Sequence, residues 1–91
     1  MVTSIILINT ERAKVNEVAG QLAEMEGVSE VYSVSGTYDL IAIVRVPNND
    51  DLAELVTQKM LALTGIVKSE TMLAFKAYSR HDLEAMFSLG M

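Results

Sequence analysis

The hydrophobic and polar positions of the chain follow two periods, one typical of strands and one typical of helices. Residues 4–8 form a β-rich apolar run, Ser-Ile-Ile-Leu-Ile, and Asn9-Thr10-Glu11 follow it with capping residues and an acidic side chain. The pattern predicts a strand that leads into a helix. Apolar residues then recur at the spacing of an amphipathic helix up to Gly27, a helix-ending glycine: Val15, Val18, Leu22 and Met25.

The segment after Gly27 predicts a hairpin, a second helix and a last strand. Residues 28–35 alternate imperfectly, Gly36-Thr37 offers a turn, and residues 39–46 carry the apolar core Leu-Ile-Ala-Ile-Val. Pro47 ends that strand, and polar residues at 48–51 supply the cap of a helix that ends at Gly65. Residues 66–78 are then expected to form the last strand.

The second half of the chain repeats the first at an offset of 38 residues, which is the separation of Gly27 and Gly65. The chain therefore consists of two βαβ units in tandem. Two such units predict an α+β, ferredoxin-like βαββαβ fold, a four-stranded antiparallel sheet with both helices on one face. The same offset relates Ile8 to Val46, Val18 to Val56, Leu22 to Met60, Met25 to Leu63 and Val28 to Ile66.

The uncovered face of this sheet is expected to be apolar. The predicted central strands, residues 5–8 and 40–44, are apolar on both faces rather than alternating. At about 25 cal/mol per Å² of apolar surface, leaving this face of the sheet exposed to water would cost many kcal/mol of folding free energy. The total stability of such a domain is only ~5–15 kcal/mol. We therefore expect two copies to pair sheet to sheet as a dimeric α+β barrel.

The length of 91 residues, 51% of them hydrophobic, suffices for one domain with one core. We expect this domain to span residues 1–79. Residues 80–91 form a tail in which Leu83, Met86 and Phe87 stand at helical spacing, which predicts a short helix.

Charge and composition argue against several classes of partner. Seven Lys and Arg against twelve Asp and Glu give a net charge of −5, the opposite of what direct nucleic-acid binding needs. Cysteine is absent, which excludes disulfides and thiolate metal sites. No apolar run approaches the roughly 20 residues that span a bilayer, and no signal-peptide pattern begins the chain, so we expect a cytoplasmic protein without membrane contact.

The sequence offers no catalytic constellation. The single histidine, His81, lies in the tail, and no nucleophile–base pair, metal cluster or phosphate loop appears at the required spacing. Asp50-Asp51 and the pair Glu24 and Glu26 lie at helix ends, where capping or solvation explains them. We expect no enzyme activity, no catalytic residue, no metal and no cofactor.

The candidate binding residues lie on the hairpin and on the last strand. Gly36, Tyr38 and Asp39 bring a glycine, an amphipathic ring and a carboxylate onto one turn beside an apolar strand, although an ordinary turn also uses Gly and Asp. Ser69 and Thr71 project hydroxyls from one face of the last strand, where polar protection of an edge strand is the alternative explanation.

The order and spacing of three segments resemble the effector-binding (RAM) domain of the leucine-responsive and asparagine regulator family, Lrp/AsnC. The likeness extends from Ser4 to Tyr78 and includes the family's Gly-x-x-Asp pattern at Gly36 and Asp39. The segments are Gly27-Val28-x-x-Val31, then Gly36-Thr37-Tyr38-Asp39-Leu40 leading into Ile43-Val44-Arg45-Val46, then Gly65-Ile66-Val67-Lys68-Ser69-Glu70-Thr71.

The resemblance implies a mode of assembly and a ligand site. In the family these domains pair sheet to sheet, the dimers assemble into rings, commonly octamers, and amino acids bind in clefts between dimers. Gly36, Tyr38 and Asp39 would then line the cleft, with Ser69 and Thr71 nearby or from an adjacent chain. Family members usually carry an N-terminal helix-turn-helix domain, whereas the first strand here begins at Ser4, so the chain looks like a stand-alone sensor half.

We therefore expect a stand-alone amino-acid-sensing and oligomerisation module without its own DNA-binding domain. Its expected partners are further copies of itself, a small amino-acid effector and full-length regulators of the family. One alternative is a structural assembly partner of those regulators that binds no ligand. A related amino-acid-binding fold, the ACT domain, would give a similar function through another interface. A small dimeric α+β barrel enzyme would need a catalytic Arg/Asn cradle or a histidine inside the barrel, and neither is found.

Overall fold

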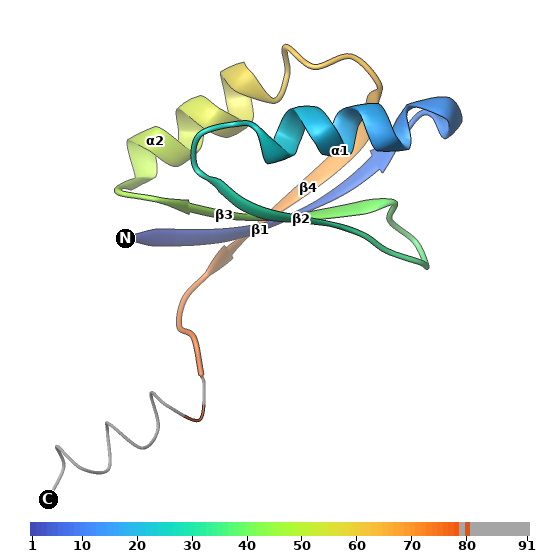
Figure 1. The fold of residues 1–91 in the computed structure, drawn as a ribbon. Coiled ribbons are helices and arrows are strands. Elements are labelled where there is room, and N and C mark those ends of the chain that lie inside the picture. Colours follow the sequence, from blue (N-terminus) through green and yellow to red (C-terminus); the bar gives the residue numbers. More distant parts are fainter. Residues whose placement is uncertain (79, 81–91) are drawn as a thin grey trace, which may run out of the picture.

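The computed structural model describes residues 1–78 and 80, so the predicted tail helix lies, apart from Arg80, outside the described residues. Figure 1 shows one sheet with two helices on the same side. The elements in chain order are β1 (Val2–Thr10), the 3-10 turn η1 (Arg12–Lys14), α1 (Val15–Ala23), β2 (Val28–Ser33), β3 (Leu40–Val46), α2 (Asn49–Glu54), the π-helical turn η2 (Leu55–Lys59) and β4 (Ile66–Ala74).

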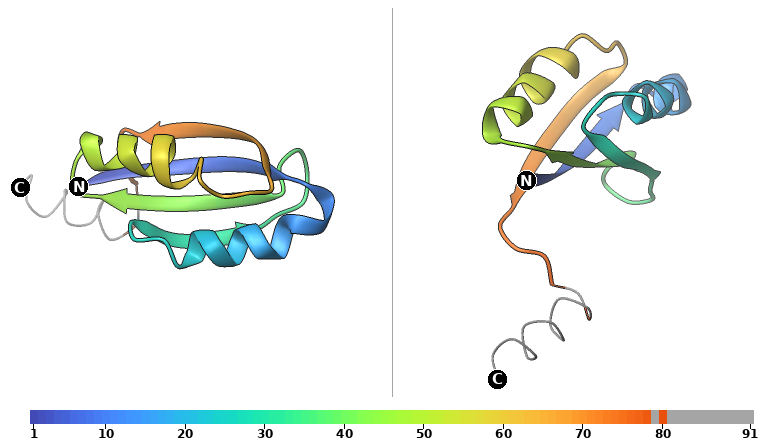
Figure 2. Two further views of the ribbon diagram at one scale, coloured as in Figure 1. Left: turned by 90° about the horizontal axis from the view of Figure 1, so that it is seen from above. Right: turned by 60° about the vertical axis from the view of Figure 1, so that its left-hand side comes forward.

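The sheet confirms the ferredoxin-like prediction. Its strand order is β2-β3-β1-β4, and every neighbouring pair is antiparallel. The two doubly apolar strands, β1 and β3, are therefore the central ones, as expected. Both views in Figure 2 place α1 and α2 on one face of this sheet, and we call the other face the open face.

The core lies between the helices and one face of the sheet. Alternate residues of β1 and β3 are buried there, and α1 adds Val18 and Leu22 while η2 adds Leu55. Burial of these apolar side chains is the main stabilising contribution. The buried apolar residues are Ile6, Ile8, Val18, Leu22, Leu40, Ala42, Val44, Val46, Leu55 and Met60.

Several element boundaries differ from the sequence prediction, among them the end of the second helix, which lies at Lys59 rather than at Gly65. The last strand ends at Ala74 rather than at Tyr78, because Ala74 pairs with Thr3 and β1 begins only one residue earlier. Asn9 and Thr10 belong to β1 and do not cap the first helix, which begins through η1 without any side-chain cap. Hydrogen bonding to neighbouring strands thus extends β1 beyond its apolar run.

The second helix begins as predicted but changes its winding. Asn48 Oδ1 accepts a hydrogen bond from the N–H of Asp51 at 2.9 Å, which confirms the cap. The Thr57 hydroxyl donates to the carbonyl of Ala53 at 2.6 Å and competes with the α-helical ladder there. The helix then widens into η2, so that Leu55 and Met60 both face the core. Among the described residues, no helix is long and apolar enough to cross a membrane.

Candidate functional site

The segment between β2 and β3, residues 34–39, forms the hairpin loop, which is tied both to itself and to β1. The N–H of Val34 donates to the carbonyl of Asp39 at 3.0 Å, and the N–H of Asp39 donates to the carbonyl of Ile8 at 2.9 Å. Asn9 Nδ2 donates to the carbonyl of Thr37 at 2.9 Å. The loop is therefore held against the carboxyl end of β1.

The carboxylate of Asp39 is half-buried and has a structural partner. Its Oδ2 accepts a hydrogen bond from the N–H of Thr10 at 2.8 Å. The pairing of β1 with β3 ends at Ile8 and Leu40, so this N–H lies beyond the ladder and finds a side-chain acceptor. Asp39 is thus not the exposed turn carboxylate with a local bond that the turn pattern indicates. Its Oδ1 accepts no hydrogen bond from the residues that the structure describes.

Tyr38 reaches across β1 to β4. Its hydroxyl donates to Glu70 Oε2 at 2.5 Å. This hydrogen bond to a carboxylate, with some desolvation, raises the pKa of Tyr38 above its ordinary value of 10.0. Glu70 was missed by the sequence argument, although its alternation with Ser69 and Thr71 placed it on the other face of the strand.

Gly36 lies at the exposed tip of the hairpin loop with a φ of 107°, a conformation that favours glycine. Within residues 1–78 and 80, the N–H groups of residues 35–38 donate no hydrogen bond. The loop therefore holds consecutive backbone donors without an acceptor in the described residues, an arrangement that suits an anionic group.

Ser69 and Thr71 lie away from the loop. They pair with Ile8 and Ile6, whose side chains are buried on the helix side of the sheet, so both hydroxyls point to that side. Ser69 lines a hollow of about 80 Å³ between the segment after η2 and β4. Within one chain the structure gathers Gly36, Tyr38 and Asp39 but not the two hydroxyls. Only an adjacent chain could unite all five residues.

The open face carries an apolar centre with a polar rim. Ile5, Leu7, Ile41 and Ile43 form directly opposed pairs across β1 and β3, and Met72 lies beside Ile5 with 42% of its surface exposed. At the β2 edge the Tyr32 hydroxyl donates to Glu30, and Arg45 lies 3.8 Å from the same carboxylate. The hydrogen bond to Glu30 raises the pKa of Tyr32. In the described part of the chain, no group of three or more His, Asp or Glu side chains could hold a metal ion.

Comparison with known proteins decides the family. A model of the Lrp/AsnC ligand binding domain matches residues 3–83. The chain belongs to this family. The match confirms the resemblance that the three sequence segments indicated, and it covers the sheet, both helices and the hairpin loop.

Relatives of the chain include transcription regulators. The uncharacterised HTH-type transcriptional regulator PF0250 of Pyrococcus furiosus is 36% identical over 59 residues, which are 65% of this chain and 39% of that protein. The chain thus corresponds to about two fifths of the length of this relative. TTHA0845 of Thermus thermophilus is 44% identical with a TM-score of 0.82, and the match covers 88% of this chain and 100% of that one.

A more distant structure shares the fold alone. The transcriptional regulator NMB0573 of Neisseria meningitidis, solved as a complex with L-Met, is 14% identical with a TM-score of 0.77. The match covers 87% of this chain and 53% of that one.

Proposed function

We propose that the protein is an amino-acid-sensing and oligomerisation module that serves transcription regulation in the cytoplasm and is not an enzyme. The match to the Lrp/AsnC ligand binding domain over residues 3–83 carries this proposal. The L-Met complex of a regulator with the same fold supports an amino acid as the effector class.

The hairpin loop has suitable chemistry for an amino-acid effector. The unpaired N–H groups of residues 35–38 can donate to an α-carboxylate, and Oδ1 of Asp39 can accept from an α-ammonium. The ring of Tyr38 adds a flat apolar wall. Ser69 and Thr71 would enter from an adjacent chain, which places the effector between dimers.

The open face supports the assembly. Pairing of two open faces buries the isoleucines and leucine of β1 and β3 and leaves the Glu30–Arg45 and Tyr38–Glu70 pairs at the rim. Such dimers would then join through other surfaces into a higher oligomer, with an octamer as the proposed form. Full-length regulators of the family contain a domain of the same fold and are the proposed protein partners, whereas the acidic chain itself does not contact nucleic acid.

The Asp39 carboxylate already accepts a hydrogen bond from the N–H of Thr10. This contact favours a second candidate function, an assembly partner of full-length regulators that binds no ligand. In that case the loop carboxylate serves only to hold the hairpin against β1. The two candidates predict opposite results when the assembled protein is exposed to free amino acids.

A thermal-shift screen of the proteinogenic amino acids separates the candidates. An effector present at one hundred times its Kd and specific for the folded state adds about 2.7 kcal/mol per site, and each kcal/mol moves the Tm of a domain of this size by about 4–8 °C. Asp39→Asn keeps an oxygen acceptor for Thr10 but removes the charge, so we expect it to abolish the shift. Glu17→Gln, the same chemical change on the exposed side of α1, should retain it. If no amino acid stabilises the wild-type protein, the sensing function is contradicted and the assembly partner is favoured.

A further inference from the structure

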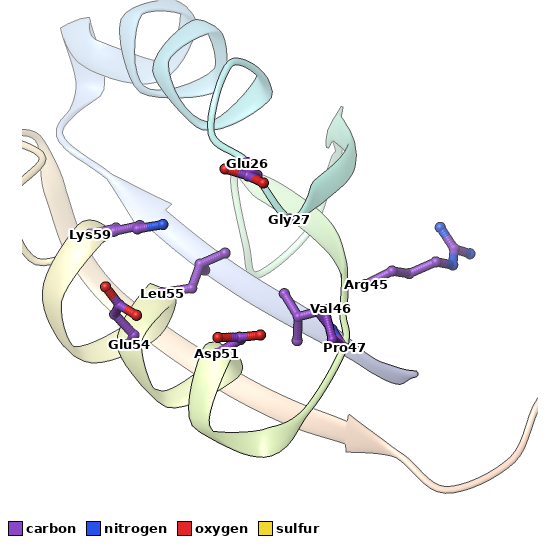
Figure 3. Close-up of a pocket in the computed structure, with 9 residues that line it drawn as sticks. All are labelled: Glu26, Gly27, Arg45, Val46, Pro47, Asp51, Glu54, Leu55 and Lys59. Atoms are coloured by element: carbon purple, nitrogen blue, oxygen red, sulfur yellow. The ribbon is translucent and has the colours of Figure 1, made fainter.

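A second cavity lies at the end of the molecule opposite the hairpin loop. This cleft, which we call the α2 cleft, has a volume of about 270 Å³ and is drawn in Figure 3. It is separated from the loop by the length of β3, roughly 20 Å at about 3.3 Å per residue. The α2 cleft is lined by Glu26, Gly27, Arg45, Val46, Pro47, Asp51, Glu54, Leu55 and Lys59.

The floor of the α2 cleft is apolar and tightly packed. Val46 and Leu55 are 5% and 2% exposed. Gly27, with a φ of 96°, lies so close that an added Cβ would stand 2.9 Å from Val46 Cγ1 and 3.1 Å from Leu55 Cδ1. The glycine therefore brings the turn between α1 and β2 down onto the floor and closes this side of the cleft.

The change of winding in the second helix shapes one wall of the α2 cleft. This wall is lined at four-residue spacing by Asp51, Leu55 and Lys59, and the last two belong to η2. In Figure 3 the Lys59 side chain extends inward above Leu55, and Glu26 faces this wall from the turn between α1 and β2. Charged groups of both signs therefore surround an apolar floor.

The charges of the α2 cleft are not neutralised within the chain. In the described residues, the ion pairs are Lys14–Glu17 and Arg45–Glu30. Three lining carboxylates and one lining ammonium consequently have no ion-pair partner, and they belong to Glu26, Asp51, Glu54 and Lys59. These groups together carry a net charge of −2, one positive charge against three negative ones, so the α2 cleft favours a ligand with net positive charge.

We propose that the α2 cleft binds a basic amino acid with an unbranched side chain, such as lysine. Its α-carboxylate would pair with Lys59, and its two ammonium groups would pair with Asp51 on the same wall and with Glu26 on the facing turn. The methylene chain would cover Val46 and Leu55. A volume of about 270 Å³, just below the usual range of roughly 300–1,000 Å³ for ligand pockets, restricts the occupant to one small molecule. This site is separate from the hairpin loop and does not depend on the function proposed for it.

Isothermal titration calorimetry of the full chain with three probes tests the ligand chemistry. L-lysine carries every group that the α2 cleft recognises, L-norleucine lacks the side-chain ammonium, and cadaverine lacks the α-carboxylate. We expect L-lysine to bind saturably and each of the other two probes to bind about 10-fold more weakly, for the loss of one charge-assisted contact. Equal affinities for L-lysine and L-norleucine would contradict the proposal.

Two conservative variants test the position. Lys59→Gln should weaken L-lysine about 10-fold yet strengthen cadaverine, because it removes the carboxylate's partner and a charge that repels the diamine. Asp51→Asn should weaken both ligands. Arg12→Gln and Glu17→Gln, at exposed positions outside the cleft, make the same charge changes and should leave both affinities unaltered.

The outcomes separate this site from the hairpin loop. L-lysine binding that survives Lys59→Gln and Asp51→Asn but disappears in Asp39→Asn would overturn the α2 cleft assignment and support the loop as the amino-acid site. The absence of L-lysine binding, with another amino acid stabilising the protein through the loop, would overturn only the α2 cleft. Binding that responds to the cleft variants alone supports the proposal.

Discussion

The carboxylate of Asp39 accepts a hydrogen bond from the N–H of Thr10 at 2.8 Å, although the two residues are 29 positions apart in the chain. This contact joins the last residue of the hairpin loop to the last residue of β1, beyond the point where the two strands stop pairing. Asp39 therefore supports the hairpin loop whether or not it also binds an effector.

The stability of the loop should depend on the acceptor oxygen at position 39 rather than on its charge. We expect Asp39→Ala to lower the free energy of unfolding by about 1–2 kcal/mol, because a half-buried N–H loses its partner. Asp39→Asn should cost less than half as much, since the amide oxygen can still accept. Chemical unfolding followed by circular dichroism measures both changes. Equal losses in the two variants would contradict the dependence on the acceptor oxygen alone.

The hydroxyl of Tyr38 should support the fold only while it is protonated. Its pKa is raised above 10.0 in the folded state by the hydrogen bond to Glu70. The contribution is therefore fully present below the ordinary pKa and is lost as the pH rises through the folded-state pKa. The difference in stability between wild type and Tyr38→Phe should shrink as the pH rises through that range.

The pKa of Tyr38 provides a second test of its hydrogen bond to Glu70. In Glu70→Gln the anionic acceptor is gone, so the Tyr38 pKa should fall toward 10.0. An NMR titration of the tyrosine ring resonances measures this shift. An unchanged Tyr38 pKa in Glu70→Gln would argue against the hydrogen bond.

The open face should control assembly. Ile43 lies near the centre of this face, opposite Ile5. Ile43→Lys would bury a charge in the sheet-to-sheet interface, and we expect dimer dissociation to become at least about 100-fold more favourable. Native mass spectrometry at micromolar concentration should show even-numbered assemblies for the wild type and monomers for the variant. Leu61→Lys, an exposed apolar residue on the helix side, should leave the dimer intact.

Two glycines should respond to alanine in opposite directions. At Gly27 the added Cβ would lie 2.9 Å from Val46 Cγ1 on a backbone with a φ of 96°, so we expect a loss of about 1–3 kcal/mol. At Gly20, inside α1, an added Cβ meets nothing within 4 Å, so alanine should stabilise the protein by about 0.4–1 kcal/mol. Thermal unfolding of both variants checks the signs. A gain in Tm for Gly27→Ala would contradict the packing of the cleft floor.

The order of strands and helices, the central position of β1 and β3 and the apolar character of the open face could all be predicted from the sequence alone. These features depend on local sequence patterns. Strands show alternation or continuous apolar runs, helices show apolar residues at three- and four-residue spacing, and a glycine follows each of the two helices. The two central strands could be identified from the sequence because they are apolar on both faces instead of alternating.

Only the tertiary structure decided which side chains meet. The partner of Asp39, the reach of Tyr38 to Glu70, and the separation of Ser69 and Thr71 from the hairpin loop all depend on the register of strands that are distant in the sequence. A shift of one residue in the pairing of β4 would exchange its two faces, and no local pattern determines that register for a strand whose residues 68–71 are polar on both faces. The α2 cleft likewise exists only because Gly27 and η2, each with an ordinary local sequence, pack against the same end of β3.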